Sequence, residues 1–152
     1  MVIICCTQKL LRRLPATHSR DPASTTRLGD WTANLIGVRQ QRFVLLVSEH
    51  SRLPVLLPAR DVKGVADHLA AALDDILLAL GVAEPAVRRE LIEMREAAFK
   101  PTNSRSVLGS VNDFAKSAQW RLYEEPDAEL IAVTLWLSRT PILSLGESRR
   151  TS

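Results

Sequence analysis

The sequence predicts an α+β fold: a small antiparallel β-sheet, made of an N-terminal strand and a hairpin, covered by a layer of about four helices. Two observations predict this class. Short runs of branched and aromatic residues occur before residue 60, whereas residues 61–138 repeat apolar side chains at helical spacing. The chain has 152 residues, enough to bury one core. We therefore expect a single globular domain over 1–145 and a flexible tail over 146–152.

The first quarter of the chain predicts a strand, a short helix and a loop. Residues 1–7 begin with an apolar run and predict a buried β-strand. Residues 7–14 place leucines on one side and basic residues on the other, which is typical of a short helix that Pro15 ends. Residues 16–27 have no apolar period and are expected to be irregular.

The next segments predict one uncertain element and a hairpin. Residues 28–36 fit both a helical turn and a strand, and Gly37 is expected to end that element. Residues 42–47 and 53–57 are strand-like and a polar turn separates them, so we expect a hairpin. Because proline cannot donate a hydrogen bond to a neighbouring strand, Pro54 is expected at an edge or a strand start.

The second half of the chain predicts helices. The clearest begins at the N-cap Asp61 and ends before Gly81. A second is expected over residues 85–98 and a third over 105–123. Residues 127–138 are apolar nearly all round and fit a buried helix or a strand. The preceding proline and the length favour the helix.

The net charge of +3 conceals an uneven distribution. Residues 1–60 carry nine Lys and Arg and three acids, whereas residues 61–152 carry eleven and fourteen. Most of the bases are arginine, which favours bidentate contact with phosphate or carboxylate. A GC-rich genome would produce the same bias without selection for binding, so both explanations stay open.

Cys5 and Cys6 are expected to be buried, with a reactive thiol or an intermolecular disulfide as alternatives. Two cysteines and three scattered histidines do not form a zinc pattern, and the sequence has no glycine-rich phosphate loop and no nucleophile elbow. We expect no metal and no cofactor. No apolar run approaches the roughly 20 residues that cross a bilayer, and basic residues follow the apolar start. A cytoplasmic protein without membrane contact is therefore expected.

Residues 105–115 (RSVLGSVNDFA) combine a helical apolar stripe with polar side chains that are poor helix formers. Gly109 inside this helix costs about 1 kcal/mol relative to Ala, which suggests close approach of another backbone or of a ligand. The candidate ligand-binding residues here are Arg105, Ser106, Ser110, Asn112 and Asp113. Alternatively, these side chains cap the helix and hydrogen-bond the irregular segment before Asn34.

Asp30 and Asn34 complete the set of candidate ligand-binding residues. Asp30 could cap a helix that begins at Trp31, which is the simpler interpretation. It could instead form a charge-assisted pair with Arg105 across the fold. Such a pair would orient a ligand or tie the two segments together.

Four segments carry a resemblance: CTQKLL at 6–11, LGDWTANL at 28–35, LPVLLPAR at 53–60 and RSVLGSVNDF at 105–114. Together they resemble a family of small prokaryotic single-domain proteins known only as a domain of unknown function. The likeness runs from the first strand to Pro141. It implies a free-standing bacterial domain and brings no activity, ligand or site. The chain departs from the family in having Cys5 beside Cys6 and a longer loop before Leu28.

Two functions fit these observations. The first is a binding or regulatory module whose basic N-terminal half contacts nucleic acid phosphates or an acidic protein. The candidate contacts are Lys9, Arg12, Arg13 and Arg27, with Arg20, Arg39 and Arg42 in the same half. The alternative is a small enzyme for a phosphorylated or nucleotide-like substrate, with Arg105 holding the anion and Asp113 or Asp30 as the base. Leu108 and Trp120 lie off the core stripe and could form a contact between copies.

Overall fold

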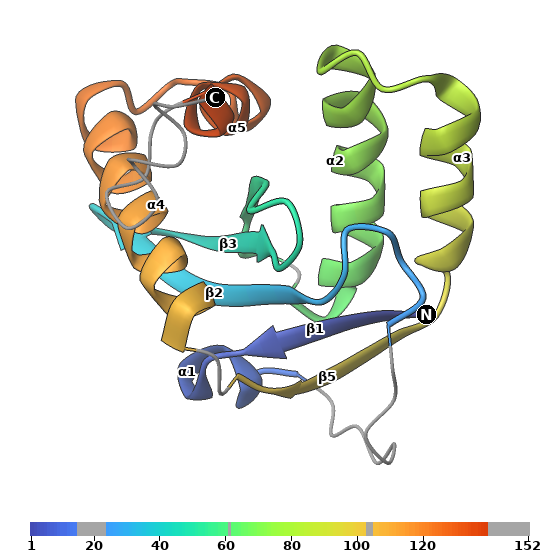
Figure 1. Cartoon of the computed structure of the whole chain (residues 1–152). Coiled ribbons are helices and arrows are strands. Elements are labelled where there is room, and N and C mark those ends of the chain that lie inside the picture. The colour runs from blue at the N-terminus through green and yellow to red at the C-terminus, as the bar shows by residue number, and fades with distance from the viewer. Residues whose placement is uncertain (15–23, 61, 103–104, 140–152) are drawn as a thin grey trace.

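Five strands form one mixed sheet in the order β4-β3-β2-β1-β5 (Figure 1). Their bounds are β1 Val2–Cys6, β2 Trp31–Val38, β3 Gln41–Ser48, β4 Pro54–Pro58 and β5 Ala97–Pro101. Strand β1 is parallel to β2 and β5, whereas β2, β3 and β4 form an antiparallel meander. This computed structural model describes residues 1–14, 24–60, 62–102 and 105–139.

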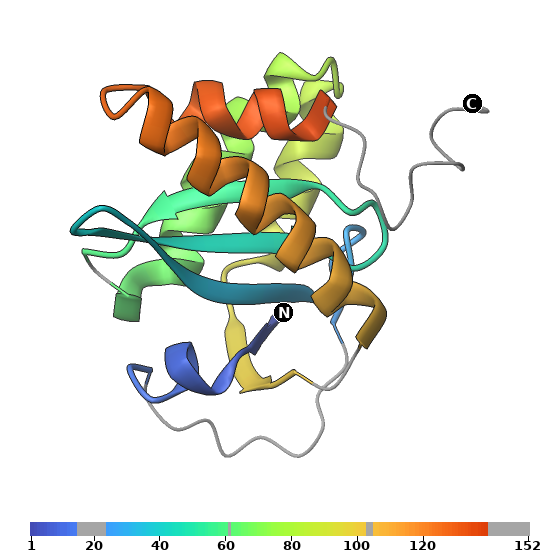
Figure 2. The same ribbon diagram turned by 90° about the vertical axis from the view of Figure 1, so that its left-hand side faces the viewer.

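Helices cover both faces of the sheet (Figure 2). Their bounds are α1 Gln8–Leu11, α2 Val65–Ala79 after the 3₁₀ turn η1 Val62–Gly64, α3 Glu84–Glu93, α4 Arg105–Glu124 and α5 Leu130–Arg139. One core packs Leu69 and Leu73 of α2 against Val44 and Leu46 of β3. The other packs α4 and α5 on the opposite face, where Leu45 lies. Alternate residues of β3 therefore point into different cores.

The α+β class is confirmed, but the sheet differs from the small antiparallel sheet that was expected. It is mixed, it has five strands, and its two faces are covered by separate helix pairs instead of one layer. The apolar residues of β1 and β3 are consecutive because both faces of these strands are buried. They therefore lack the alternation of buried and exposed residues that a sheet covered on one face would show.

Residues 28–36 contain no helix, so the interpretation of Asp30 as a helix N-cap is wrong. Strand β2 begins at Trp31, and Gly37 lies within it, paired with Arg42 of β3, so the expected break at Gly37 is wrong too. Hydrogen bonds to β1 on one side and β3 on the other decide the conformation. These partners are distant in sequence, so a local pattern cannot reveal them.

The second predicted helix is shorter than expected, because α3 ends at Glu93 and Ala98 belongs to β5. Strand β5 pairs in parallel with β1, with Ala98 opposite Ile3 and Lys100 opposite Cys5. The segment AAFKP has too few branched residues to predict a strand by itself. The segment becomes strand β5 because β1 has a free edge to which its backbone can hydrogen-bond.

Other elements agree with the sequence. The β3–β4 hairpin forms, and β4, which carries Pro54, is an edge strand. Most of residues 127–138 form helix α5, which begins at Leu130. Residues 16–23 of the predicted loop, the predicted N-cap Asp61, residues 103–104 and the tail lie outside the described residues.

A buried carboxylate fastens the segment before β2 to α3. Glu90 is 6% exposed, and its two oxygens accept the backbone N–H groups of Arg27 and Leu28 at 2.8 and 3.0 Å. Hydrogen bonds to a charged acceptor are stronger than those to a neutral one. Glu90 therefore fixes the path of the chain into Asp30 and β2.

We expect Leu69→Ala to lower the free energy of unfolding by about 2–5 kcal/mol, because the Leu69 side chain is fully buried between α2 and the sheet. Leu78→Ala on the same helix is the matched control, since Leu78 is 45% exposed, and we expect it to change stability by less than about 1 kcal/mol. Urea unfolding measures both. Equal effects of the two substitutions would contradict the packing of α2.

Candidate functional site

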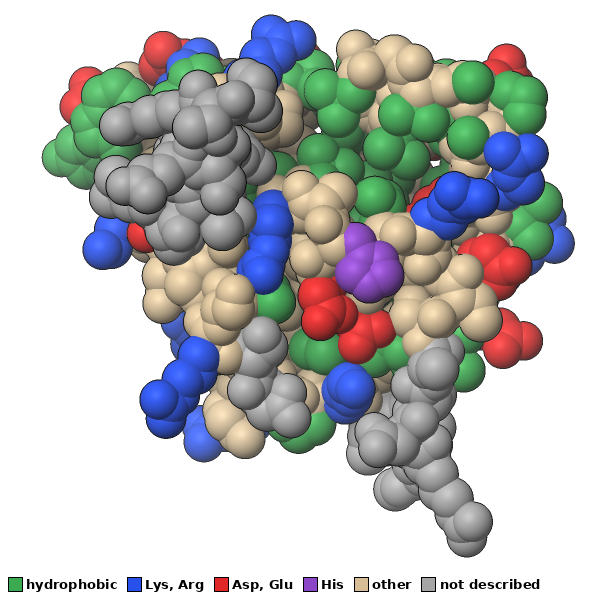
Figure 3. Space-filling model, in the orientation of Figure 1, with side chains coloured by type: hydrophobic (Ala, Val, Ile, Leu, Met, Phe, Trp, Pro, Cys, Tyr) green, Lys and Arg blue, Asp and Glu red, His purple; other side chains and the backbone are tan. Residues whose placement is uncertain are grey.

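Charged side chains from three strand ends meet beside the N-terminal half of α4. Asp30 precedes β2, Glu49 and His50 follow β3, and Lys100 lies in β5. The Lys100 ammonium is 3.9 Å from an Asp30 carboxylate oxygen, and the Glu49 N–H donates to the Asp30 carbonyl at 2.8 Å. With Arg52 these residues form the polar patch. Figure 3 shows acidic side chains next to a histidine there, with basic side chains close by.

The environment of Asp30 makes its carboxyl harder to ionise. Burial raises the pKa of Asp30 above its ordinary value, and the nearby charge of Glu49 adds to this effect. The charges of Lys100 and His50 act in the opposite direction. Because burial has the largest effect, the net result is a raised pKa of Asp30. A carboxyl with a raised pKa is suited to proton transfer.

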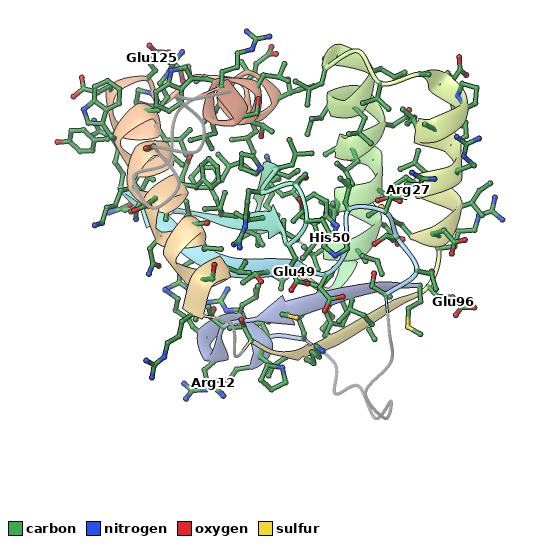
Figure 4. The ribbon with its side chains drawn as sticks, in the orientation of Figure 1. Arg12, Arg27, Glu49, His50, Glu96 and Glu125 are labelled. Atoms are coloured by element: carbon green, nitrogen blue, oxygen red, sulfur yellow. The ribbon has the colours of Figure 1, made fainter. Side chains whose placement is uncertain are left out.

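Gly29 and His50 build the corner that presents Asp30. Gly29 has φ +77°, and a Cβ atom at this position would lie 2.9 Å from the His50 ring. The His50 Nδ1 atom is 3.1 Å from the Arg27 carbonyl oxygen. Figure 4 shows Glu49 and His50 side by side at this corner. Only glycine combines this backbone conformation with such close contact.

Both cysteine thiols are buried: Cys5 lies close to this patch, and Cys6 points to the other face of β1, into the core that α2 covers. Burial and the neighbouring charge of Asp30 raise the pKa of Cys5 to about 11, and burial raises the pKa of Cys6 to about 12. Both side chains are therefore protonated thiols at neutral pH, which makes them poor nucleophiles.

Arg52 binds two of the candidate residues predicted from the sequence, Ser106 and Ser110. Its guanidinium donates to Ser106 Oγ at 3.0 Å and to Ser110 Oγ at 3.3 Å. Arg52 has φ +57°, a left-handed conformation that is rare for a residue with a side chain. The hairpin turn thus holds the guanidinium against the first two turns of α4.

The remaining candidates from the ligand-binding set are spread along α4 and β2. Asn34 Oδ1 accepts a hydrogen bond from Thr7 Oγ1 at 2.9 Å. Arg105 and Asn112 are exposed and Asp113 is half-buried. Asp30 pairs with Lys100, and the structure shows no ion pair between Asp30 and Arg105.

Gly109 does not make the close backbone approach that its position suggests. Apart from its chain neighbours and the backbone of its own helix, no atom of a described residue lies within 4 Å of the place where its Cβ would be. A ligand beside α4 is the other reason the sequence gives for a glycine, and the open space leaves room for one.

The four candidate phosphate contacts do not form one surface. Lys9 and Arg12 are exposed on and just after α1, whereas Arg27 lies near α3 (Figure 4). Arg27 lines a cavity of about 520 Å³ together with apolar residues of α2 and α3. Arg13 lies elsewhere, in a cleft with other arginines.

This basic cleft has a volume of about 530 Å³ and lies at the β2–β3 turn. Its polar lining consists of Arg13, Gln40, Gln41, Arg42 and Arg60, and its apolar lining includes Leu122 and Leu130. None of the described residues that line it is acidic, and no ion pair joins its three arginines to a described residue. An adjoining hollow is lined by Arg39, Gln40, Gln41 and Leu122. The cleft can therefore hold an anion.

Sequence reasoning missed Arg52, Lys100 and Arg60 as site residues. Arg60 follows the edge strand β4. Arg52 and Lys100 have no local pattern that distinguishes them from other surface bases. Their partners lie 30 or more positions away in the chain, so only pairing of distant segments identifies them.

A comparison with known protein families identifies the family of this chain. A family model described as "Domain of unknown function (DUF6933)" matches residues 3–150. The chain belongs to this DUF6933 family. The match covers all four segments that carried the resemblance, and the family description names no activity. No curated protein and no solved structure matches the chain.

Two classes of feature are absent from the part of the DUF6933 chain that the structure describes. None of its helices is both long and apolar enough to cross a membrane. No group of three or more His, Cys, Asp or Glu side chains in the same ranges is placed to hold a metal ion.

We expect Asp30→Asn to alter the pH dependence of stability. Because the folded-state pKa of Asp30 is raised, the folded state binds the proton more tightly than the unfolded chain does. Stability should therefore fall as pH rises from the ordinary carboxyl value through the raised one. The variant should lack this fall, so that its stability relative to the parent increases as pH rises through this interval. Urea unfolding across this pH range measures the difference. The exposed Asp67→Asn is the control, and a flat difference for Asp30→Asn would contradict the raised pKa.

We expect Arg52 and its two serines to act as one unit. Arg52→Ala should lower the free energy of unfolding by about 1–2 kcal/mol, because it removes two charge-assisted hydrogen bonds. Adding Ser106→Ala and Ser110→Ala to this variant should then have a smaller effect than the same pair has in the parent. Chemical unfolding of the four proteins gives the coupling energy. Strict additivity would show that these hydrogen bonds do not stabilise the fold.

Proposed function

We propose that this protein is a cytoplasmic module that binds the phosphates of a nucleic acid in the basic cleft. One observation carries the proposal: Arg13, Arg42 and Arg60 come from separate segments and converge on a single cleft. Arg13 follows α1, Arg42 lies in β3, and Arg60 follows β4. Three like charges around one cleft, none of them in an ion pair with a described residue, repel one another, and a bound anion would relieve this repulsion.

The chemistry of the lining favours phosphate. Guanidinium groups bind phosphate oxygens through two parallel N–H donors, which lysine cannot do. The Gln40 and Gln41 amides can donate further hydrogen bonds without adding charge. The apolar part of the lining includes Phe43, Pro58, Leu122 and Leu130, so the preference for phosphate over an acidic protein rests on the guanidinium groups.

An acidic connection between α4 and α5 limits how far this binding surface extends. Pro126 and Ala128 line the cleft, whereas the carboxylates of Asp127 and Glu129 are absent from its lining. Glu125 is held by Arg121, with the two charged groups 3.3 Å apart. These acids repel phosphates above the cleft, so we propose that a short stretch of backbone is bound.

A small enzyme is the second candidate, favoured by the raised pKa of Asp30 beside Lys100. In this alternative Asp30 would act as the base and Arg52 would orient an anionic substrate. The hydrogen bonds from Arg52 to Ser106 and Ser110 use part of its binding capacity, which places this candidate second.

We expect the double substitution Arg42→Ala and Arg60→Ala to weaken nucleic acid binding about tenfold or more and to make it less sensitive to salt. Each lost phosphate contact should reduce the slope of log K against log salt by roughly 0.7–0.9. Fluorescence anisotropy with a labelled oligonucleotide at several salt concentrations measures both. The matched control is Arg89→Ala with Arg95→Ala, which removes the same charge from exposed positions near α3. If both double variants weaken binding equally, net charge and not the cleft is responsible.

A further inference from the structure

We infer that the nucleic acid is single-stranded and that its unpaired bases stack on aromatic side chains beside the basic cleft. This inference rests on the proposed function and names the class of nucleic acid. The aromatic platform consists of Trp120, Tyr123 and Trp136, from α4 and α5.

Two of the three platform side chains lie in solvent, and Trp136 is half-buried beside them. Trp120 is 59% and Tyr123 56% exposed, whereas Trp31 and Phe114 are buried in the cores. Trp120 and Trp136 are stacked with ring centroids 6.3 Å apart and 29° between their planes. Exposed tryptophan and tyrosine rings close together are typical of binding surfaces, because each ring offers a large apolar face.

Neighbouring arginines hold the platform in place. The Arg121 guanidinium lies 5.0 Å from the centre of the Trp136 ring, and the Arg39 guanidinium lies 4.3 Å from the centre of the Tyr123 ring. Trp120 and Tyr123 are three residues apart on α4, so their side chains share one face of the helix. Because these rings are already oriented, a base that stacks on them loses less ordering entropy.

Arg39 connects the platform to the basic cleft. It lines the hollow that adjoins the cleft, and it also donates to the Tyr123 carbonyl at 3.2 Å. Leu122, next to Tyr123, lines both the cleft and the hollow. Gln119 donates to the Gly37 carbonyl at 3.0 Å, which fastens α4 to β2 near its end. Figure 2 shows the β2–β3 turn and the α4–α5 connection on the same side of the molecule.

This arrangement matches one ligand chemistry, a chain of phosphates that carries exposed flat rings. Single strands bind proteins through basic grooves and aromatic stacking of successive bases. A duplex keeps its bases stacked on one another, so it could use the cleft but not the platform. A second copy of this protein would offer no phosphates to the arginines of the basic cleft, so it would match only the aromatic part of this surface.

The test compares three labelled ligands of equal length by fluorescence anisotropy: oligothymidylate, an abasic strand with the same phosphates, and a duplex. We expect the parent protein to bind oligothymidylate roughly tenfold more tightly than the abasic strand. Trp120→Ala with Tyr123→Ala should abolish this preference and leave affinity for the abasic strand unchanged. The control Leu78→Ala with Ile92→Ala removes exposed apolar side chains elsewhere and should keep the preference. Thermal melting checks that each variant is folded.

The outcomes separate this inference from the proposed function. If the parent binds the abasic strand as tightly as oligothymidylate, or prefers the duplex, the platform does not stack bases and the inference is wrong. The cleft proposal then stands provided that the arginine variant weakens binding. If the parent binds none of the three ligands, both are wrong. If the platform variant keeps the preference but changes the oligomeric state in sedimentation, the platform is a contact between copies, and the inference is wrong.

Discussion

The position of strand β1 is the constraint on which the rest of this structure depends. Its five residues are buried, and it forms parallel pairs with β2 on one edge and β5 on the other. Parallel strands cannot be joined by a tight turn, so the chain must leave the sheet and return on both occasions. The connection from β1 to β2 contains α1 and the segment that Glu90 holds. The connection from β4 to β5 contains α2 and α3, which cover one face of the sheet and complete one core.

This path explains why side chains from distant segments meet. The chain enters β2 at Asp30, leaves β3 at Glu49, and passes Lys100 in β5 on the far side of β1. The same order brings the end of α1 near the β2–β3 turn, where Arg13 meets Arg42 and Arg60. The two groups of charges therefore lie at different ends of one sheet, and they differ in character. The polar patch pairs opposite charges, whereas the basic cleft collects like charges.

The difference bears on function. Opposite charges in the polar patch satisfy one another, as Lys100 does for Asp30, and Arg52 is satisfied in part by the serines of α4. Such contacts stabilise the fold whether or not a ligand binds there. The arginines of the basic cleft have no comparable partner among the described residues, and like charges near one another destabilise the free protein. A fold that retains this repulsion between arginines is consistent with binding of an anion.

The sequence by itself determined the elements with strong local patterns: β1, the β3–β4 hairpin, α2, α4 and α5 were all predicted near their observed bounds. Apolar spacing and turn residues are local, so one segment contains the whole pattern. Tertiary structure alone decided that 31–38 is a strand, that β5 exists, and that Asp30 faces Lys100 and not Arg105. It also decided which predicted bases share a cleft and that Trp120 and Tyr123 are exposed. The physical reason is that strand pairing and charge pairing join residues far apart in the chain, and their energies depend on contacts that no single segment contains.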